Sequence, residues 1–158
     1  MYVFFFLLTF VFILADILSK LAAVRFLQPI ETYPIIKNVF HLTYCRNTGA
    51  AFSIFSGSTK LLAFVSALMI VLILVYIIYK KPQSRLLLLS FSMIIAGGIG
   101  NVIDRILRGY VVDFFDFRLI NFAIFNVADI FVCVGVALLA VYIFKNDFKN
   151  ESREENDI

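Results

Sequence analysis

Long apolar stretches separated by short polar segments dominate the pattern of the chain. They run over Tyr2–Leu18, Leu61–Tyr79, Leu86–Ile103 and Asn126–Phe144. Each is close to the length of about 20 residues that a helix needs to cross the hydrocarbon core of a bilayer. The pattern therefore predicts an all-α integral membrane protein with four transmembrane helices.

The connections after the first and third apolar stretches have a different character. Arg25–Ser58 contains Pro29 and Pro34, and its Val39–Tyr44 part is rich in β-branched and aromatic residues, which are typical of strands. We expect a small extracytoplasmic β-rich region between helices 1 and 2. Asp113–Phe125 is aromatic and irregular, and we expect an interfacial loop or a short strand there.

Composition agrees with a membrane protein. Hydrophobic residues make up 62% of the 158 residues, compared with about 45–50% in soluble domains, and the mean hydropathy is +0.96. Residues 145–158 hold three basic and five acidic residues, which leaves eleven basic and six acidic residues in 1–144. We expect a single membrane-embedded domain over 1–144 and a polar, disordered cytoplasmic tail over 145–158. The basic excess favours anionic lipid headgroups, and the lack of a clustered basic face argues against a nucleic-acid partner.

The distribution of positive charge predicts the orientation in the membrane. Lys80, Lys81 and Arg85 lie within six residues between the second and third apolar stretches, a density typical of a cytoplasmic turn. Lys20–Lys60 carries five basic residues over a longer segment. With an even number of spans, both termini are then cytoplasmic. The first stretch lacks the basic flank of a cleavable signal peptide, so we expect it to be a retained helix.

Cysteine and histidine are too few and too scattered for a metal centre. The chain has Cys45, Cys133 and a single histidine, His41, without CxxC spacing, so we expect no metal and no cofactor. Cys133 lies within an apolar stretch, where we expect it to act as a small buried hydrophobe. The sequence leaves open a disulfide between the two cysteines.

Polar residues near the apolar stretches gather at one membrane surface. In four antiparallel helices, the end of the first, the start of the second, the end of the third and the start of the fourth lie on the same side. A carboxylate inside hydrocarbon is costly, so this segregation indicates a functional site at that surface rather than scattered helix contacts. The polar residues at these four ends are Asp16, Lys20, Asn47, Asn101, Asp104, Arg105, Asn126 and Asp129.

Two carboxylates stand out among the acidic residues near the predicted spans. Asp113 and Asp129 have no basic residue within four positions. Asp16, by contrast, can pair with Lys20 one helical turn away, and Asp104 and Asp116 also have basic neighbours. Two carboxylates brought together without a counterion cannot both ionise easily, so the pair holds a shared proton near neutral pH. Such a pair can activate water and protonate a leaving amine, as in aspartic proteolysis. Whether the two carboxylates meet depends on the fold.

Five short segments carry a family resemblance. In chain order they are Asp16–Lys20 (DILSK), Arg46–Phe52 (RNTGAAF), Gly97–Arg105 (GGIGNVIDR), Gly109–Phe114 (GYVVDF) and Phe125–Asp129 (FNVAD). Together they resemble the signature blocks of bacterial lipoprotein signal peptidase, also called signal peptidase II. The resemblance implies a membrane aspartic endopeptidase that removes the signal peptide from diacylglyceryl-modified prolipoproteins and cuts just before the lipidated cysteine.

The resemblance also implies roles for particular residues. Asp113 and Asp129 correspond to the catalytic dyad. The partners that the resemblance implies for the protein are lipid-modified prolipoproteins and membrane lipid. We expect a monomer in the bacterial cytoplasmic (inner) membrane. Its active site should lie at the extracytoplasmic face. The residues expected to support the site or bind substrate are Asp16, Lys20, Asn47, Gly49, Asn101, Asp104, Arg105, Asn126 and Ala128.

Two other functions remain open at this point. A cysteine peptidase could use Cys45 with His41, although an i, i+4 spacing in a strand separates the two by about 13 Å. A transporter or channel could also place Asp and Arg in the membrane, but it would usually carry them near the midplane or along a pathway. Here the charged residues gather at one end of the predicted bundle.

Overall fold

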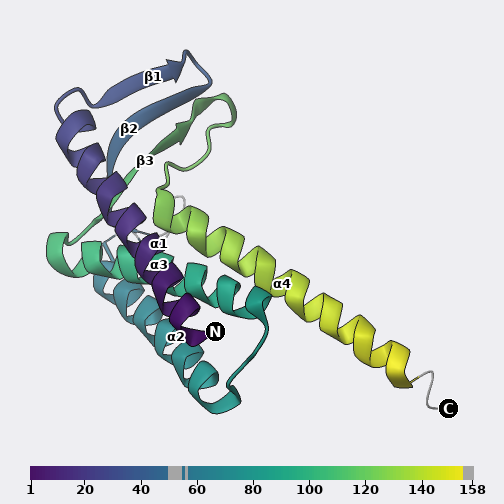
Figure 1. Cartoon of the computed structure of the whole chain (residues 1–158). Helices are drawn as coiled ribbons and strands as arrows, with labels where there is room; N and C mark the ends of the chain where they lie inside the picture. The colour runs from purple at the N-terminus through teal and green to yellow at the C-terminus, as the bar shows by residue number, and fades with distance from the viewer. Residues whose placement is uncertain (50–54, 56, 155–158) are drawn as a thin grey trace.

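The computed structural model describes residues 1–49, 55 and 57–154, with the backbone alone for 147–154. Over these residues, four long helices carry a small sheet at one end of the molecule (Figure 1). The fold expected from the sequence is confirmed. The helices are α1 Tyr2–Ala22, α2 Thr59–Lys80, α3 Arg85–Arg108 and α4 Val127–Glu154; the strands are β1 Thr32–Ile36, β2 Phe40–Asn47 and β3 Val111–Phe117. A π-helical turn, η1 Ala23–Leu27, extends α1, and a 3₁₀ turn, η3 Arg118–Ile120, follows β3.

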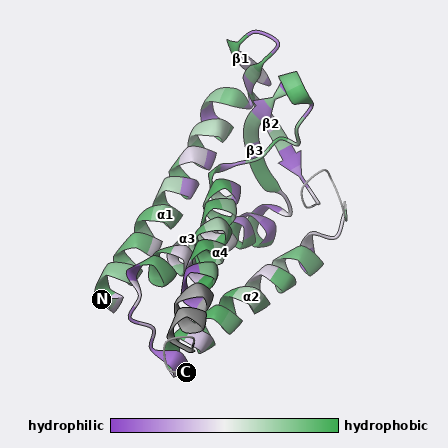
Figure 2. Cartoon of the chain, turned by 90° about the vertical axis from the view of Figure 1, so that its right-hand side faces the viewer, coloured by the Kyte–Doolittle hydropathy of each residue, from purple (hydrophilic) through white to green (hydrophobic). Residues whose placement is uncertain are grey.

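All four helices are long and apolar enough to cross a membrane. Figure 2 shows hydrophobic residues along most of α1 and α2. Protein contacts bury 56% of the most apolar part of α3 but only 6% of that of α2. Because the outer surfaces of α1, α2 and α4 are apolar and uncovered, they suit contact with lipid, while α3 forms the centre of the bundle.

Small residues let the other helices approach α3 closely. A Cβ atom on Gly97 would collide with the backbone carbonyl of Ala128 in α4, and one on Gly100 would collide with the Asp16 carboxylate of α1. Gly135 of α4 faces the backbone of Ser90 in the same way, because a Cβ there would lie 2.9 Å from the Ser90 carbonyl oxygen. The packing role of these glycines explains why polar groups from three helices meet at one level of the bundle.

The sheet has the order β1-β2-β3 with antiparallel neighbours. The predicted β-rich region between α1 and α2 is confirmed as β1 and β2. The third strand comes after α3, in the segment for which we expected a loop or a short strand. On one face, Val112 and Phe114 of β3 pack against Ala23 and Leu27 of η1. On the other face lies Asp113, which is directly opposite Cys45 of β2.

The first helix continues beyond the apolar stretch to Ala22 and so carries Lys20 one turn after Asp16. Two smaller expectations are wrong. The tail begins as helix, because α4 continues to Glu154 through a segment without Pro or Gly to stop it. Cys133 is exposed rather than buried, and both cysteines are free.

Candidate active site

The first turn of α4 fixes the position of Asp129. Asn126 precedes the helix, and its side-chain oxygen accepts a hydrogen bond from the Asp129 backbone N–H at 3.0 Å. In return, the Asp129 carboxylate accepts the Asn126 backbone N–H at 3.1 Å. This reciprocal pair is a capping box, which satisfies donors at the helix start. The second Asp129 oxygen accepts a hydrogen bond from the Asn101 side chain of α3 at 2.8 Å.

Asp113 is held by two amide side chains. Asn47 at the end of β2 donates to one carboxylate oxygen at 2.8 Å, and Asn126 donates to the other at 2.6 Å. The carboxylate is almost completely buried, with 1% of Asp113 exposed. Asn126 thus contacts both carboxylates, so the two residues that lacked a basic neighbour in the sequence meet in one hydrogen-bond network.

Lys20 of α1 lies beneath this network. Its ammonium group forms ion pairs with Asp16 at 2.8 Å and with Asp104 at 3.4 Å. It also donates to the side-chain oxygen of Asn101 at 2.9 Å, the residue that donates to Asp129. Only 3% of Lys20 is exposed. A single buried cation therefore connects α1 to α3 and supports one of the two carboxylates.

The two anions paired with Lys20 fix the elements that carry Asp113 and Asp129. Asp16 accepts the backbone N–H of Ala128 at 3.0 Å, a donor in the first turn of α4 that has no partner within the helix. Asp104 accepts the backbone N–H of Val112 in β3 at 3.1 Å and pairs with Arg108 at 3.0 Å. The sequence predicted the Asp16–Lys20 pair, whereas these backbone contacts required the fold.

The pKa of Asp113 is raised from 3.8 to about 7. Burial is the largest cause and the charge of Asp129 is the next, while the hydrogen bonds from Asn47 and Asn126 act in the opposite direction. Burial disfavours the charged form, and a neighbouring carboxylate does the same. The structure thus supports the predicted shared proton near neutral pH.

This pKa predicts how stability depends on pH. Between pH 4 and 7 the folded protein keeps a proton on Asp113 that the unfolded chain has lost, so raising the pH through this range favours unfolding. Relative to Asp113→Asn, the parent protein should lose up to about 4 kcal/mol of unfolding free energy from pH 4 to pH 8. Thermal unfolding of both proteins in detergent at several pH values measures the difference.

Asp116→Asn is the control for this experiment. Burial opposes ionisation of Asp116, but hydrogen bonds from Thr43 and Arg118 and the charge of Arg118 outweigh it and lower its pKa. Ionised Asp116 therefore stabilises the fold above pH 4, and its replacement should destabilise the protein at pH 8. This change in unfolding free energy is opposite in sign to the one expected for Asp113→Asn. A parent and an Asp113→Asn variant with parallel pH profiles would contradict a raised pKa at Asp113.

Both carboxylates face a pocket of about 530 Å³. Asp113, Asp129, Asn47, Asn101 and Arg105 form its polar end. The remaining walls are largely apolar and come from α2, α3, α4 and the segment before α4, where they include Leu62, Val65, Gly98, Phe125, Ile130 and Val132. No feature of the sequence indicated that α2, an uninterrupted apolar stretch, would line the site. Cys133, one turn after Asp129, also lines the pocket.

Arg105 and Gly49 complete the set of predicted residues. Arg105 donates to the backbone carbonyl of Gly49 at 3.3 Å, and the Gly49 N–H donates to the Asn47 side chain at 2.8 Å. The second contact is an Asx turn, in which an Asn side chain bonds the backbone two residues on. The Ala50–Phe52 part of this segment lies outside the described residues.

The geometry does not favour a cysteine peptidase. Cys45 is opposite Asp113, whereas His41 is opposite Asp116 on the other face of the sheet. The His41 ring contacts the Thr32 hydroxyl at 3.5 Å and the Asn38 N–H at 3.3 Å. Burial and the nearby Asp113 and Asp116 raise the pKa of the Cys45 thiol, which leaves it protonated and a poor nucleophile.

Comparison with known proteins identifies the family. A family model described as signal peptidase (SPase) II matches residues 8–145. The chain belongs to the signal peptidase II family. The lipoprotein signal peptidase of Clostridium acetobutylicum is 42% identical over 144 residues, which cover 89% of this chain and 94% of that protein. That of Halothermothrix orenii is 44% identical over 135 residues, which cover 85% and 91%.

Solved structures agree with this membership. A structure described as a bacterial membrane enzyme, determined by the in meso method at 2.3 Å resolution, has a TM-score of 0.83 and 27% identity, and the match covers 90% of this chain and 88% of that one. A second such structure, at 1.9 Å resolution, has a TM-score of 0.79. The protein is thus a multi-pass membrane peptidase of the aspartic type, and the signal peptidase II family cleaves signal peptides from lipoprotein precursors. The transporter interpretation is set aside.

Proposed function

We propose that Asp113 and Asp129 form a catalytic dyad that cleaves the peptide bond immediately before a lipid-modified cysteine. The observation that carries this proposal is the convergence of the two carboxylates at the polar end of an apolar pocket. The remaining predicted residues orient the dyad, with Asn126 contacting both of its members.

The proposed chemistry follows from the pKa of Asp113. Near neutral pH, Asp113 holds a proton, and its O–H donates to the carbonyl oxygen of the scissile bond. Asp129 accepts a proton from a water molecule, whose oxygen attacks the carbonyl carbon. A carboxyl proton then passes to the leaving amine as the C–N bond breaks, and the dyad again holds one shared proton.

The pocket suits an apolar peptide that is already in the membrane. Leu62 and Val65 of α2 and Ile130 and Val132 of α4 line its interior. Their apolar side chains would replace the lipid contacts that an entering apolar peptide gives up. A signal peptide that enters laterally from the bilayer would place its last residues at the dyad. The proposed setting is the bacterial cytoplasmic membrane, with residues 1–144 as one domain, lipid around a monomer and the active site at the extracytoplasmic face.

A cleavage assay tests the proposal. Purified protein is mixed with a prolipoprotein that carries a diacylglyceryl-modified cysteine and, separately, with the same precursor without lipid. We expect release of the signal peptide from the lipidated precursor, and mass spectrometry should find the modified cysteine at the new N-terminus. Equal cleavage of both precursors, or a different cut position, would contradict the proposed specificity.

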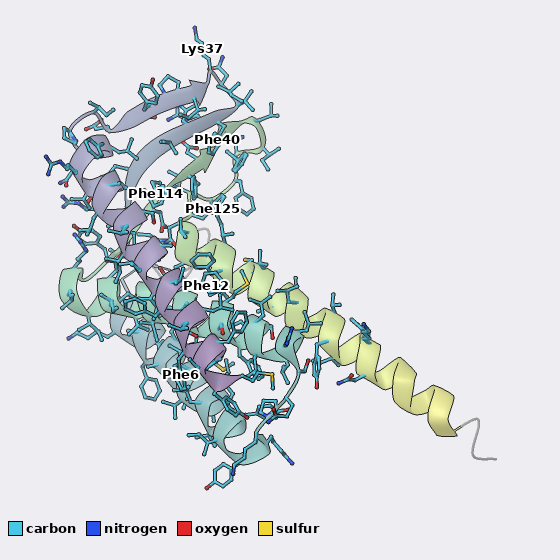
Figure 3. The ribbon with its side chains drawn as sticks, viewed as in Figure 1. Phe6, Phe12, Lys37, Phe40, Phe114 and Phe125 are labelled. Atoms are coloured by element: carbon cyan, nitrogen blue, oxygen red, sulfur yellow. The ribbon has the colours of Figure 1, made fainter. Side chains whose placement is uncertain are left out.

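Reporter fusions test the predicted orientation. The turn between β1 and β2 includes Lys37, which lies at the outer tip of the sheet (Figure 3). A reporter that is active only outside the cytoplasm should be active when inserted beside Lys37 and silent when fused after Ile158, because Lys80, Lys81 and Arg85 favour a cytoplasmic turn. The reverse pattern would place the dyad at the cytoplasmic surface.

A further inference from the structure

Aromatic side chains form a connected surface on the sheet. Phe40 of β2 packs against Phe115 and Phe117 of β3, with ring centroids 6.2 and 4.7 Å apart. Phe125 lies 5.5 Å from Phe115 and 5.9 Å from Phe117, and Phe122 lies 5.8 Å from Phe125. We call these five residues the aromatic surface.

The aromatic surface shares a face of the sheet with Asp113. Side chains alternate along a strand, so Asp113, Phe115 and Phe117 point to one side of β3. Phe40 is directly opposite Phe117 and therefore projects on that side too. Phe122 and Phe125 line the pocket together with Asp113. In Figure 3, Phe125 lies beside the start of α4 and Phe40 lies farther out along the sheet, so the aromatic surface leads away from the dyad.

The fold accounts for only part of this surface. Phe115 packs against the core cluster that includes Ala23 and Leu27 of η1. The opposite face of β3 carries a polar network in which Thr43 and Arg118 hydrogen-bond to Asp116. On the aromatic side, 39% of Phe117 remains exposed. A contiguous apolar patch that continues from a binding pocket indicates a ligand contact.

We infer that the aromatic surface binds the acyl chains of the lipid-modified cysteine, and this inference rests on the proposed function. A signal peptide in the pocket between α2, α3 and α4 reaches the dyad from the membrane side. The residue after the scissile bond therefore lies beyond the dyad, toward the sheet. Its two ester-linked chains begin within a few atoms of that residue, and the aromatic surface is the apolar wall that continues from Asp113 in this direction.

Substrates that differ in acyl-chain length test this inference. Two precursors with the same peptide carry either two 16-carbon chains or two 4-carbon chains on the glyceryl group, and kcat/KM is measured for each in detergent. Phe117→Ser should lower the ratio of the long-chain value to the short-chain value about tenfold, through KM, because an apolar contact with the longer chains is lost. Phe117→Leu keeps an apolar side chain and should preserve most of the ratio.

Phe26→Ser is the matched control. Phe26 is 66% exposed and belongs to η1, which packs against the opposite face of the sheet, so its replacement should leave the ratio unchanged. An equal fall for both precursors in Phe117→Ser would assign the surface to the peptide or to folding. An equal effect of Phe26→Ser and Phe117→Ser would mean that the ratio reports contact with the surrounding lipid. Each of these two results, or an unchanged ratio in Phe117→Ser, would overturn the inference. If the parent protein cleaves neither precursor, the proposed function itself fails.

Discussion

Asp113→Asn and Asp129→Asn should each lower cleavage of the lipidated precursor by about 10⁴-fold or more. Asn has nearly the shape of Asp but cannot exchange a proton, so either substitution removes the shared proton on which the proposed mechanism depends. Purified variants are compared with the parent protein in the cleavage assay. Folding should be preserved, because removing one of two neighbouring carboxylates relieves repulsion.

The double variant and one further residue complete this experiment. Asp113→Asn combined with Asp129→Asn should be no slower than either single variant, because residues that act as a unit are strongly non-additive. Asp116→Asn should retain most of the activity, since Asp116 pairs with Arg118 on the opposite face of the sheet. Near-parental turnover in either single dyad variant would show that the dyad is assigned incorrectly.

Lys20→Ala should destabilise the protein by about 3–5 kcal/mol. The substitution leaves Asp16 and Asp104 buried without their shared cation, and Asp16 is completely inaccessible to solvent. Asn101 also loses its donor at 2.9 Å, so the support of Asp129 weakens. Thermal or denaturant unfolding in detergent measures the stability, and the cleavage assay should show reduced activity in parallel.

The control for Lys20, which lies in the last turn of α1, is a lysine at the start of α2. Lys60 lies in the first turn of α2 and is exposed, so Lys60→Ala should change stability by less than about 0.5 kcal/mol. A Lys20→Ala protein that is as stable as the parent but inactive would assign Lys20 a direct role in substrate binding instead of a supporting one.

Local sequence was enough to predict the four apolar helices and the end of the bundle that carries the polar residues. Both follow from local physical chemistry: apolar length sets the spans, and the cost of charge in hydrocarbon confines Asp and Arg to a site. The absence of a basic neighbour also singled out Asp113 and Asp129, because it depends only on residues within four positions. The pairing of Lys20 with Asp16 could be predicted as well, because these two residues are only four positions apart.

The contacts between these residues depend on how distant parts of the chain pack together. The contacts of Asp16 with the Ala128 N–H and of Asp104 with the Val112 N–H join segments far apart in the chain, and no local pattern encodes a backbone donor that a distant carboxylate will accept. The pocket wall from α2 and the exposure of Cys133 depend on how helices pack. The raised pKa of Asp113 likewise required burial and the approach of Asp129, which arise only when β3 and α4 meet.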